Sequence, residues 1–591
     1  MTYFEREFVA KFEALESIKL NPIASCLHPT SKMLAMTNVS NFYFVSTHSS
    51  AQTGSRLFRF RSIVTLKVKS GNDDATTIFL LQMPLLTLGI AVSVFFAWLL
   101  YQYDPAVNPP SSLDLIACPT QNQKDAVHRF SKFLQFPSLG DASAPFHVKD
   151  EAVFKDMISH LSSSYSLVWS TLDVEMVGNG SLSLLLTWRG SDPSLLPVLL
   201  ISHYDVVPVT PGTEGDWSYP PFSGAVEEGY IWGRGALDVK FSAACILEAL
   251  TSLIQAGKGP RRTIMLAVGH DEEITGTQGA FATAELLQYR GLKFEAILDE
   301  GGIILSEGIA PFTQTPVAII GTSEKVSTTV EISILSAGGH SSMPQTDNSD
   351  VGTQVAKLIT HVKRNPFKSS LKQPVIGFLK ALVPYCKNKL LRVIMIHCDS
   401  WPMSWLISTA FSFLSRETAA MVRTTTAVVN LAAGVADNVL PQQGSVRYNI
   451  RSHPAETSHD KILSYMNKAM TNLGVNGTVK VLKSSNFGPV PTVSSSEAHV
   501  YQAMKQAIQE LWHHHGSSIA VAPYLMMGGT DSKFYAHLSE NGVYRFCPQS
   551  INRTNGDLDR IHGTDERVSI TDFLLGICTY RRMLDLIAVD I

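Results

Sequence analysis

Five short segments carrying histidine, acidic residues or both are spread along this chain, and several of them directly follow an apolar run. They are HYDVVP at His203–Pro208, GRGALDVK at Gly233–Lys240, GHDEE at Gly269–Glu273, DEGG at Asp299–Gly302 and IHGTDE at Ile561–Glu566. The runs VLLIS, TIMLAV and EAIL precede the first, third and fourth segments. Polar residues at the ends of short buried strands are typical of an open α/β sheet, whose sites lie at the carboxyl edge. We therefore expect an α/β fold with a site assembled at that edge.

These segments supply the ligand types that zinc accepts, imidazole nitrogen and carboxylate oxygen. A two-metal hydrolase needs a bridging carboxylate, further His and acidic ligands on each ion, and a free carboxylate that deprotonates water. The candidate ligands for two zinc ions are His203, Asp238, Glu273, one of Asp299 or Glu300, and His562. Glu272, beside a ligand, remains free to act as the general base.

With these residues in this order, the chain resembles the zinc exopeptidase family. That family includes carboxypeptidase S, aminoacylase, bacterial glutamate carboxypeptidase and the secreted N-fatty-acyl amino acid synthase/hydrolase. The resemblance covers roughly Cys118 to Ile591, and the segments from HYDVVP to DEGG together with YRFCP and RIHG look closer to the last member. It implies a catalytic domain with a mostly parallel sheet flanked by helices.

The resemblance also implies a role for each site residue. Asp238 bridges the ions, His203 and the acid of DEGG complete one site, and Glu273 and His562 complete the other. Asp205 orients His203, and Glu272 is the base. Consecutive strand side chains point to opposite faces, so only one of Asp299 and Glu300 can face the metal. Alignment with aminoacylase favours Glu300, whereas a one-residue slip selects Asp299.

The pattern around these segments predicts alternating helices and strands. Helices are expected at Val239–Gln255, which Gly257 ends, and at about Gly276–Tyr289; strands are expected at Thr263–Val268 and Ala296–Leu298. About 260 residues then separate Glu300 from His562, more than a loop holds, so a second domain is inserted there. The expected boundaries are 118–322 and 484–591 for the catalytic domain and 323–483 for the insertion.

The inserted domain reads as an α+β unit. Strands are predicted at Val326–Leu335 and Gly444–Arg451, and helices at Asp350–Val362 and His459–Met470. The resemblance implies a lid with a four-stranded sheet backed by two helices, through which a homodimer could form. An additional apolar stretch, Pro374–Arg416, is expected to form core helices of an enlarged lid, or else an apolar surface for a lipid chain or membrane.

Several further residues are assigned to substrate by resemblance alone. His340 in GGHSS matches a histidine that the family brings to the scissile carbonyl, in dimeric members across the subunit interface. Asn438 and Arg451 match positions that hold the substrate's carbonyl and terminal carboxylate, and a guanidinium suits a carboxylate because it donates two parallel hydrogen bonds. The loop Gly529–Asp531, which includes Thr530, is expected near the site.

The amino-terminal region has a different character. Ala75–Tyr103 carries no charged residue, and the mostly apolar run Ile78–Tyr101 is long enough to span a bilayer core of about 30 Å. Basic residues precede it and acidic residues follow it, which predicts a transmembrane signal anchor at 76–103 with a lumenal or extracellular catalytic part. Secretion after cleavage is the alternative. Residues 1–75 are expected to be a disordered tail.

Three glycosylation sequons support a location outside the cytosol, at Asn179, Asn476 and Asn552. The seven cysteines form no dense framework; Cys386 and Cys398 could pair, and Cys245 is expected to be a buried thiol. The net charge of −3 gives no electrostatic reason to invoke nucleic acid.

Together these features predict a zinc-dependent amidohydrolase or metallopeptidase. The favoured substrate is an N-fatty-acyl amino acid, which the enzyme hydrolyses or forms. The alternatives are a carboxypeptidase S-like enzyme acting on short peptides and a membrane-tethered binding protein on a decayed hydrolase scaffold. Because the ligand set and Glu272 are intact, the sequence argues against decay.

Overall fold

A computed structural model describes residues 42–44, 65–68, 76–79, 123–454, 459–484, 493–514 and 517–591. The chain divides into two compact units, residues 1–106 and 107–591. In the first unit, strands β1 (Phe42–Phe44), β2 (Thr65–Val68) and β3 (Thr76–Phe79) pair antiparallel.

The predicted membrane segment falls almost wholly outside the described residues. Ile78 and Phe79 end strand β3, and residues 80–101 are not described. Among the residues that the structure does describe, no helix is long and apolar enough to cross a bilayer.

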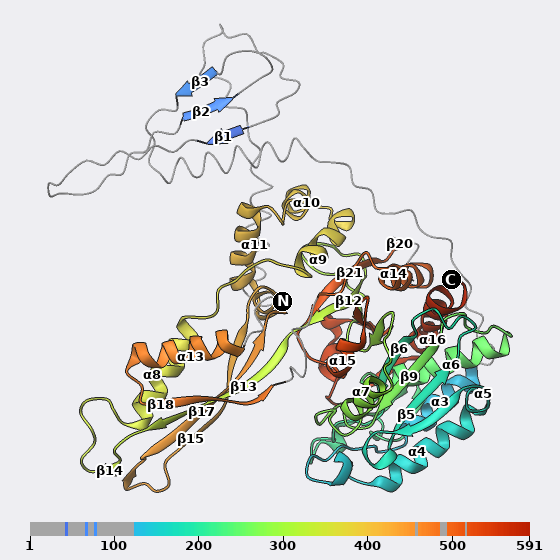
Figure 1. Ribbon diagram of the computed structural model, residues 1–591, viewed down its shortest axis with the longest axis horizontal. Helices are drawn as coiled ribbons and strands as arrows, with labels where there is room; N and C mark the ends of the chain where they lie inside the picture. Colours follow the sequence, from blue (N-terminus) through green and yellow to red (C-terminus); the bar gives the residue numbers. More distant parts are fainter. Residues whose placement is uncertain are drawn as a thin grey trace. The chain divides into compact units, whose positions relative to one another are not determined.

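A ten-stranded sheet forms the centre of the second unit (Figure 1). Its order is β23 (Ser550–Ile551), β11 (Ile304–Leu305), β12 (Val317–Glu324), β22 (Val543–Arg545), β10 (Ile297–Asp299), β6 (Val198–His203), β9 (Ile264–Gly269), β5 (Ser183–Trp188) and β4 (Asp173–Val177), with β21 (Ala520–Met526) beside β12. The neighbours from β22 through β10 and β6 to β9 are parallel. Every residue of β6 and β9 is buried, as expected when helices cover both faces of a parallel sheet.

Alternate residues of β6 enter two different cores. Val198 and Leu200 join the larger core with α6 (Lys240–Gln255), α14 (His499–Leu511) and α16 (Ile570–Leu584). Leu199 and Ile201 join the smaller core with α7 (Ala280–Tyr289) and α15 (Ser532–Tyr535). Helices α3 (Gln123–Leu134), α4 (Glu151–Ser164) and α5 (Ser166–Thr171) also contribute to the larger core. The predicted sheet with helices on both faces is therefore confirmed.

Helix α7 begins about one turn later than its apolar pattern predicted. The reason is the buried Asp271, whose carboxylate accepts hydrogen bonds from the backbone N–H groups of Gln278 and Gly279. Its carbonyl also accepts from Thr275 N–H and Gly276 N–H. These bonds hold residues 271–279 as a turn that a helix would break.

The inserted domain has the predicted α+β architecture. Its antiparallel sheet has the order β15 (Thr425–Ala433), β17 (Gln443–Ser452), β13 (Val326–Leu335) and β18 (Gly477–Ser484). Buried and half-exposed residues alternate along β13, and helices α8 (Val351–Arg364) and α13 (His459–Leu473) cover the buried face. The Asp350 side chain caps α8 by accepting from Thr353 N–H.

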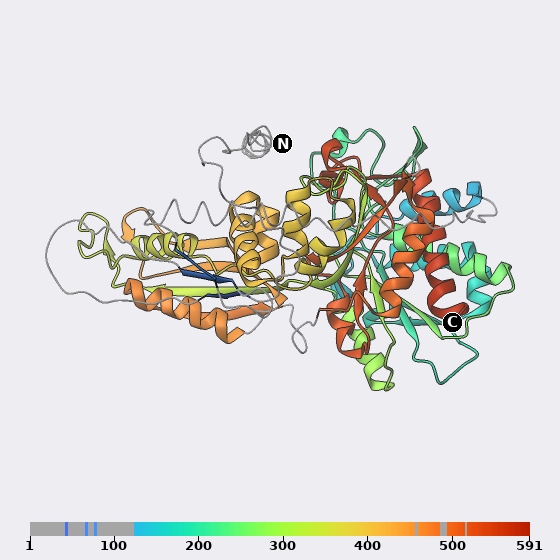
Figure 2. The same ribbon diagram turned by 90° about the horizontal axis from the view of Figure 1, so that it is seen from above.

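The additional apolar stretch forms three α-helices, α9 (Val375–Leu382), α10 (Lys389–Ile396) and α11 (Trp401–Leu414), and α12 (Arg416–Val422) follows directly. Figures 1 and 2 show α9, α10 and α11 grouped together. Buried residues of this group belong to the same core as the central sheet, so the stretch is in part ordinary core.

The suggested Cys386–Cys398 disulfide is wrong, because both are free buried thiols; the prediction of a buried thiol at Cys245 is confirmed.

Candidate metal centre

Asp238 lies between two histidines from distant parts of the chain. Its Oδ1 is 3.3 Å from His203 Nε2, and its Oδ2 is 3.0 Å from His562 Nε2. One carboxylate thus presents a different oxygen to each imidazole. This is the arrangement expected of a carboxylate that bridges two metal ions.

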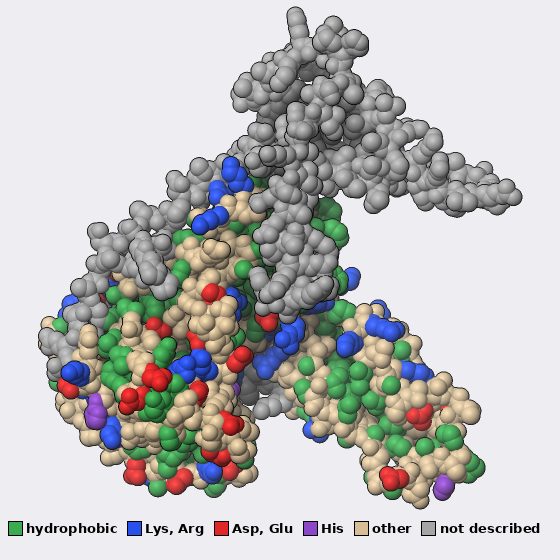
Figure 3. All heavy atoms as spheres, turned by 180° about the vertical axis from the view of Figure 1, so that it is seen from behind, with side chains coloured by type: hydrophobic (Ala, Val, Ile, Leu, Met, Phe, Trp, Pro, Cys, Tyr) green, Lys and Arg blue, Asp and Glu red, His purple; other side chains and the backbone are tan. Residues whose placement is uncertain are grey.

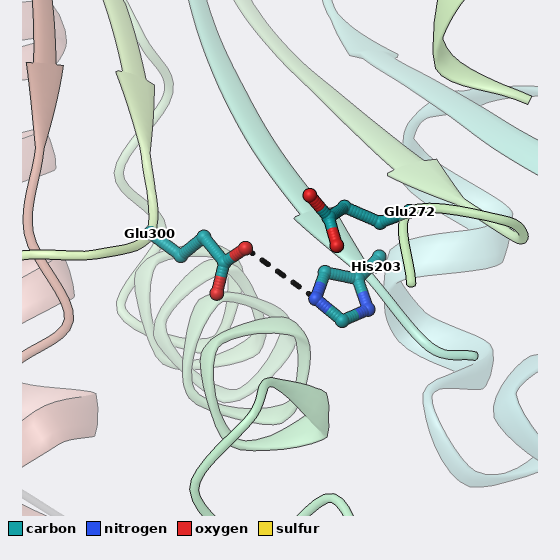
Figure 4. A group of neighbouring side chains, drawn as sticks. All are labelled: His203, Glu272 and Glu300. Atoms are coloured by element: carbon teal, nitrogen blue, oxygen red, sulfur yellow. Dashed lines mark ion pairs between the residues drawn. The ribbon is translucent and has the colours of Figure 1, made fainter. Parts of the chain in front are cut away.

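Each histidine faces one further carboxylate. Glu300 Oε1 is 3.4 Å from His203 Nε2, and Glu273 Oε1 is 3.2 Å from His562 Nε2. Glu272 completes the cluster, and Figure 4 shows Glu300 facing one ring nitrogen of His203 and the Glu272 carboxylate above the same ring. The donor atoms of His203, Glu272 and Glu300 lie within 4.8 Å of one another, as do those of His203, Asp238 and Glu273.

The donor set fits a divalent metal ion. His203 Nε2 and Glu273 Oε1 are buried and have no hydrogen-bond partner, although both face the centre of the cluster. Buried polar atoms without partners are costly, so they indicate a missing ligand. Imidazole and carboxylate in this number suit zinc, and manganese and cobalt accept them as well.

The sheet positions most of these residues. His203 ends β6, Glu272 and Glu273 follow β9, and Glu300 follows β10; the three strands are adjacent and parallel. Their carboxyl ends therefore meet at one edge. Asp238 lies in the turn before α6, and His562 lies in a loop after η8 (Asp557–Arg560) with φ of 62°.

The structure separates the neighbours Asp299 and Glu300. Asp299 Oδ2 accepts a hydrogen bond from Ser532 N–H, and its Oδ1 accepts from the N–H of Glu300. Both oxygens of Asp299 are thus occupied within the fold, and Glu300 alone of the pair is in contact with His203. This geometry favours Glu300 as the ligand.

Asp205 contacts His203 from the side away from the cluster. Its Oδ1 is 3.3 Å from His203 Nδ1, and its backbone carbonyl is 3.1 Å from the same nitrogen. The Asp205 carboxylate also accepts from the backbone N–H groups of Glu272 and Glu273. It therefore fixes the imidazole and the turn that carries both glutamates, which supports the orienting role assigned from the sequence.

Burial and mutual charge shift the pKa values of the cluster. Burial and the negative charges of Asp531 and Glu300 raise the pKa of Glu272 well above its ordinary value. Burial and the charge of Asp238 raise the pKa of Glu300 to about 8, while the contacts with the carboxylates of Asp238 and Glu273 raise the pKa of His562 to about 10. The protons so held offset the negative charge, and a divalent cation would take their place because its ligands must be deprotonated.

Glu566 is a site residue that sequence reasoning missed. Its Oε1 accepts hydrogen bonds from three backbone N–H groups of the loop that carries the shared aspartate, those of Gly235, Leu237 and Asp238. Its Oε2 accepts from the guanidinium of Arg234, which in turn donates to the carbonyl of His562. Glu566 in IHGTDE and Arg234 in GRGALDVK both stand in segments that the sequence singles out. Their pairing across 332 residues could not be read from the sequence.

We expect Glu566→Gln to weaken metal binding by about 10- to 100-fold, because a neutral amide cannot accept from all these donors and leaves Arg234 buried without its counter-charge. The measurement is zinc affinity by competition with a chromogenic chelator, together with the thermal unfolding of the metal-free protein. The matched control is Asp565→Asn, which removes only exposed hydrogen bonds to Ser218. Wild-type zinc affinity in Glu566→Gln would show that the hydrogen bonds accepted by Glu566 are dispensable for metal binding.

The lid residues assigned to substrate do not join the metal cluster in the contacts of the described residues. His340 lies in the short exposed strand β14 (Gly339–His340) and contacts Ser342, and Asn438 is exposed. Arg451 is half-buried in β17, where Nε donates to Asn449. Burial lowers the pKa of Arg451, and the charge of Glu324 partly opposes this.

Thr530 lies much nearer to the cluster. Its N–H donates to Glu324 and its hydroxyl contacts Ser532, which binds Asp299. The adjacent Asp531 is buried with neither carboxylate oxygen hydrogen-bonded, and Lys533 Nζ is 3.9 Å away. The loop therefore packs against the strand end that carries Glu300.

Comparison with known proteins shows what this chain is similar to. Residues 199–586 match the sequence profile of peptidase family M20/M25/M40. The chain is 34% identical over 451 residues to N-fatty-acyl-amino acid synthase/hydrolase PM20D1 of Xenopus tropicalis, covering 76% of this chain and 83% of that protein. It is 29% identical to carboxypeptidase S of Saccharomyces cerevisiae, covering 79% and 84%.

A solved structure shares the fold. The M20 family metallo-carboxypeptidase Sso-CP2 of Sulfolobus solfataricus superposes with a TM-score of 0.56 at 17% identity, covering 78% of this chain and 98% of that chain. At this identity the likeness concerns the fold alone.

Proposed function

This chain belongs to peptidase family M20/M25/M40 and is a metal-dependent hydrolase, and we propose that it cleaves the amide bond between an acyl group and an amino acid with a free carboxylate. The observation that carries the proposal is that His203 and His562 both contact Asp238. The carboxylate of Glu272 lies beside them but takes part in neither of these two contacts. The reverse condensation uses the same residues when fatty acid and amino acid are abundant.

Two zinc ions would be held by His203, Asp238 and Glu300 on one side and by Asp238, Glu273 and His562 on the other, and would supply Lewis acidity and a water of lowered pKa. Glu272 accepts the proton of the attacking water on its carboxylate and then donates it to the leaving nitrogen. Burial raises the pKa of Glu272, so its carboxylate is a stronger base for this proton than an exposed glutamate would be.

We assign the recognition of the substrate to the lid and the loop at Thr530. Arg451 binds the free carboxylate through its guanidinium, and its partial burial strengthens that contact. His340 and Asn438 act at the scissile carbonyl. Because both are exposed and outside the metal cluster of the described residues, they reach it by lid movement or from a second subunit.

A homodimer through the lid is part of this proposal. Strand β15 is at one edge of the lid sheet, paired only with β17 in that sheet, and Val428, Val429 and Leu431 on it are exposed. An edge strand with exposed apolar residues is suited to pairing with another chain.

We further propose a lumenal or secreted location for the protein, which is supported by the exposure of the sequon residues Asn179 and Asn476.

The acyl group distinguishes two candidate activities, and relatives of both kinds match the chain. The favoured substrate is an N-fatty-acyl amino acid. A carboxypeptidase S-like activity on short peptides is the second candidate, supported by the likeness to that enzyme over most of its length.

The deciding experiment supplies the zinc-loaded enzyme with N-oleoyl-phenylalanine and a blocked Gly-Leu dipeptide at equal concentration and measures amino acid release. We expect preferential cleavage of the oleoyl amide. N-oleoyl-phenethylamine, which lacks the carboxylate, is the matched control and should be cleaved at least about 100-fold more slowly, because Arg451 is then left without a partner. Preferential release of leucine would establish the peptidase instead, and release from neither amino acid substrate would point to a decayed scaffold.

A further inference from the structure

Helix α11 presents an apolar face at the protein surface. Trp401, Trp405 and Phe413 have 85%, 65% and 82% of their surfaces exposed. With 100° between successive residues, these three side chains lie on one side of the helix, opposite the buried Ile407 and Phe411. Surface helices of soluble proteins usually carry polar residues on the outward side, so this face indicates a partner.

The rest of that face is also without charge. Pro402, Leu406 and Ala410 are exposed there, and Trp401–Leu414 contains no acidic or basic residue. Tryptophan and phenylalanine on an uncharged helix are typical of side chains that enter the interface between lipid headgroups and acyl chains.

The segment that carries α11 is strongly basic. Residues 365–416 contain one acidic residue, Asp399, and seven basic residues: Lys368, Lys372, Lys380, Lys387, Lys389, Arg392 and Arg416. The whole chain, in contrast, has a net charge of −3. This excess of six positive charges within one short segment predicts attraction to an anionic surface.

Three of these basic residues lie close to α11. Ser404 of α11 donates a hydrogen bond to the carbonyl of Leu371, which places exposed Lys372 next to the first turns of the helix. Lys380 binds Asp399 just before the helix, and Arg416 follows its end. Figure 3 shows basic side chains at the top of the described surface.

We propose that α11 and the basic residues around it form a docking surface for anionic phospholipid membranes. The aromatic side chains enter the headgroup region, while the lysines and arginines bind lipid phosphates and carboxylates. The proposal concerns how the enzyme reaches a lipid surface and does not depend on which amide it cleaves.

Charge favours this partner over the other candidates. A second copy of the chain would bring its own positive segment against the first, and like charges at an interface oppose association. One acyl chain of a substrate would cover an apolar face but would leave the surrounding lysines without counter-charges.

The test is co-sedimentation of the full chain with vesicles of phosphatidylcholine alone and of equal parts phosphatidylcholine and phosphatidylserine. We expect binding to the anionic vesicles, weakened by salt. Combined Trp401→Ser, Trp405→Ser and Phe413→Ser should weaken it about tenfold or more. Combined Lys372→Gln and Lys387→Gln should also weaken it about tenfold. Two matched controls should bind like the wild type. Tyr289→Ser removes an aromatic side chain that is 90% exposed elsewhere on the protein, and Lys363→Gln combined with Lys468→Gln removes two exposed lysines elsewhere.

A local probe separates this surface from the apolar run at residues 78–101. Ala410→Cys labelled with an environment-sensitive dye should brighten with anionic vesicles, whereas the same dye at Tyr289→Cys should not. Unchanged binding in both α11 variants, or no response at position 410, would overturn the proposal. It would also be overturned by a dimer that dissociates in the aromatic variant, or by a dye response to free oleate with none to vesicles.

Discussion

Glu272→Gln is expected to lower kcat by about a thousandfold while leaving bound metal unchanged, because the amide cannot accept the proton of water. The carboxylate of Glu272 lies beside His203 but outside the shortest contacts that define the two ligand sets (Figure 4). A general base, unlike a ligand, is dispensable for metal binding. The measurement is kcat on N-oleoyl-phenylalanine together with zinc content by mass spectrometry.

The control is Glu285→Gln, which changes an exposed glutamate on α7 and should retain full activity. Loss of metal together with activity in Glu272→Gln would instead place this residue among the ligands, a role that its proximity to His203 and Glu300 also permits. Wild-type activity would remove Glu272 from the reaction altogether.

Asp238→Asn is expected to abolish activity by removing the carboxylate that both histidines face. Removing an outer hydrogen-bond partner of a ligand costs about 10- to 100-fold in metal affinity, so replacing a ligand shared by two ions should exceed the upper end of that range. We expect zinc content to fall toward zero for both ions at once. Glu300→Gln should affect the ion near His203 more than the other, because Glu300 contacts only that histidine.

Thermal unfolding gives a second readout that does not require turnover. Added zinc should raise the Tm of the wild type, since a ligand that binds only the folded state stabilises it, and should leave the Tm of Asp238→Asn nearly unchanged. Asp216→Asn, at an exposed position, is the matched control. One ion retained at full affinity in Asp238→Asn would exclude a shared carboxylate.

The elements beside the site were largely predictable because their patterns are strong. Strand β13 has the predicted limits and β17 differs by one residue at each end, since buried positions alternate along both strands. Helix α6 begins one residue after its predicted start and ends where predicted, since it is a long and almost wholly buried run. The start of α7 was not predictable, because the carboxylate of Asp271 competes for backbone N–H groups in a way that apolar periodicity does not register.

Side-chain partners across long sequence separations were beyond sequence reasoning. The choice between Asp299 and Glu300 depended on Ser532 N–H, and the role of Glu566 depended on Arg234. The exposed aromatic face of α11 was likewise undecided, because the same apolar composition fits a core helix. In the structure one side of the helix belongs to the core and another side is an apolar surface, since Phe411 is buried and Trp401 is exposed.

The bond between Arg234 and Glu566 has a consequence for biosynthesis. A ribosome completes Asp238 and His203 long before it reaches Glu566 and His562, and the entire lid is made in between. The nascent chain therefore cannot assemble the centre until His562 and Glu566 have emerged. Some chains will lack His562 because translation stops early or a protease removes the end of the chain. We expect such truncated chains to be unable to retain zinc, however well their sheet has folded.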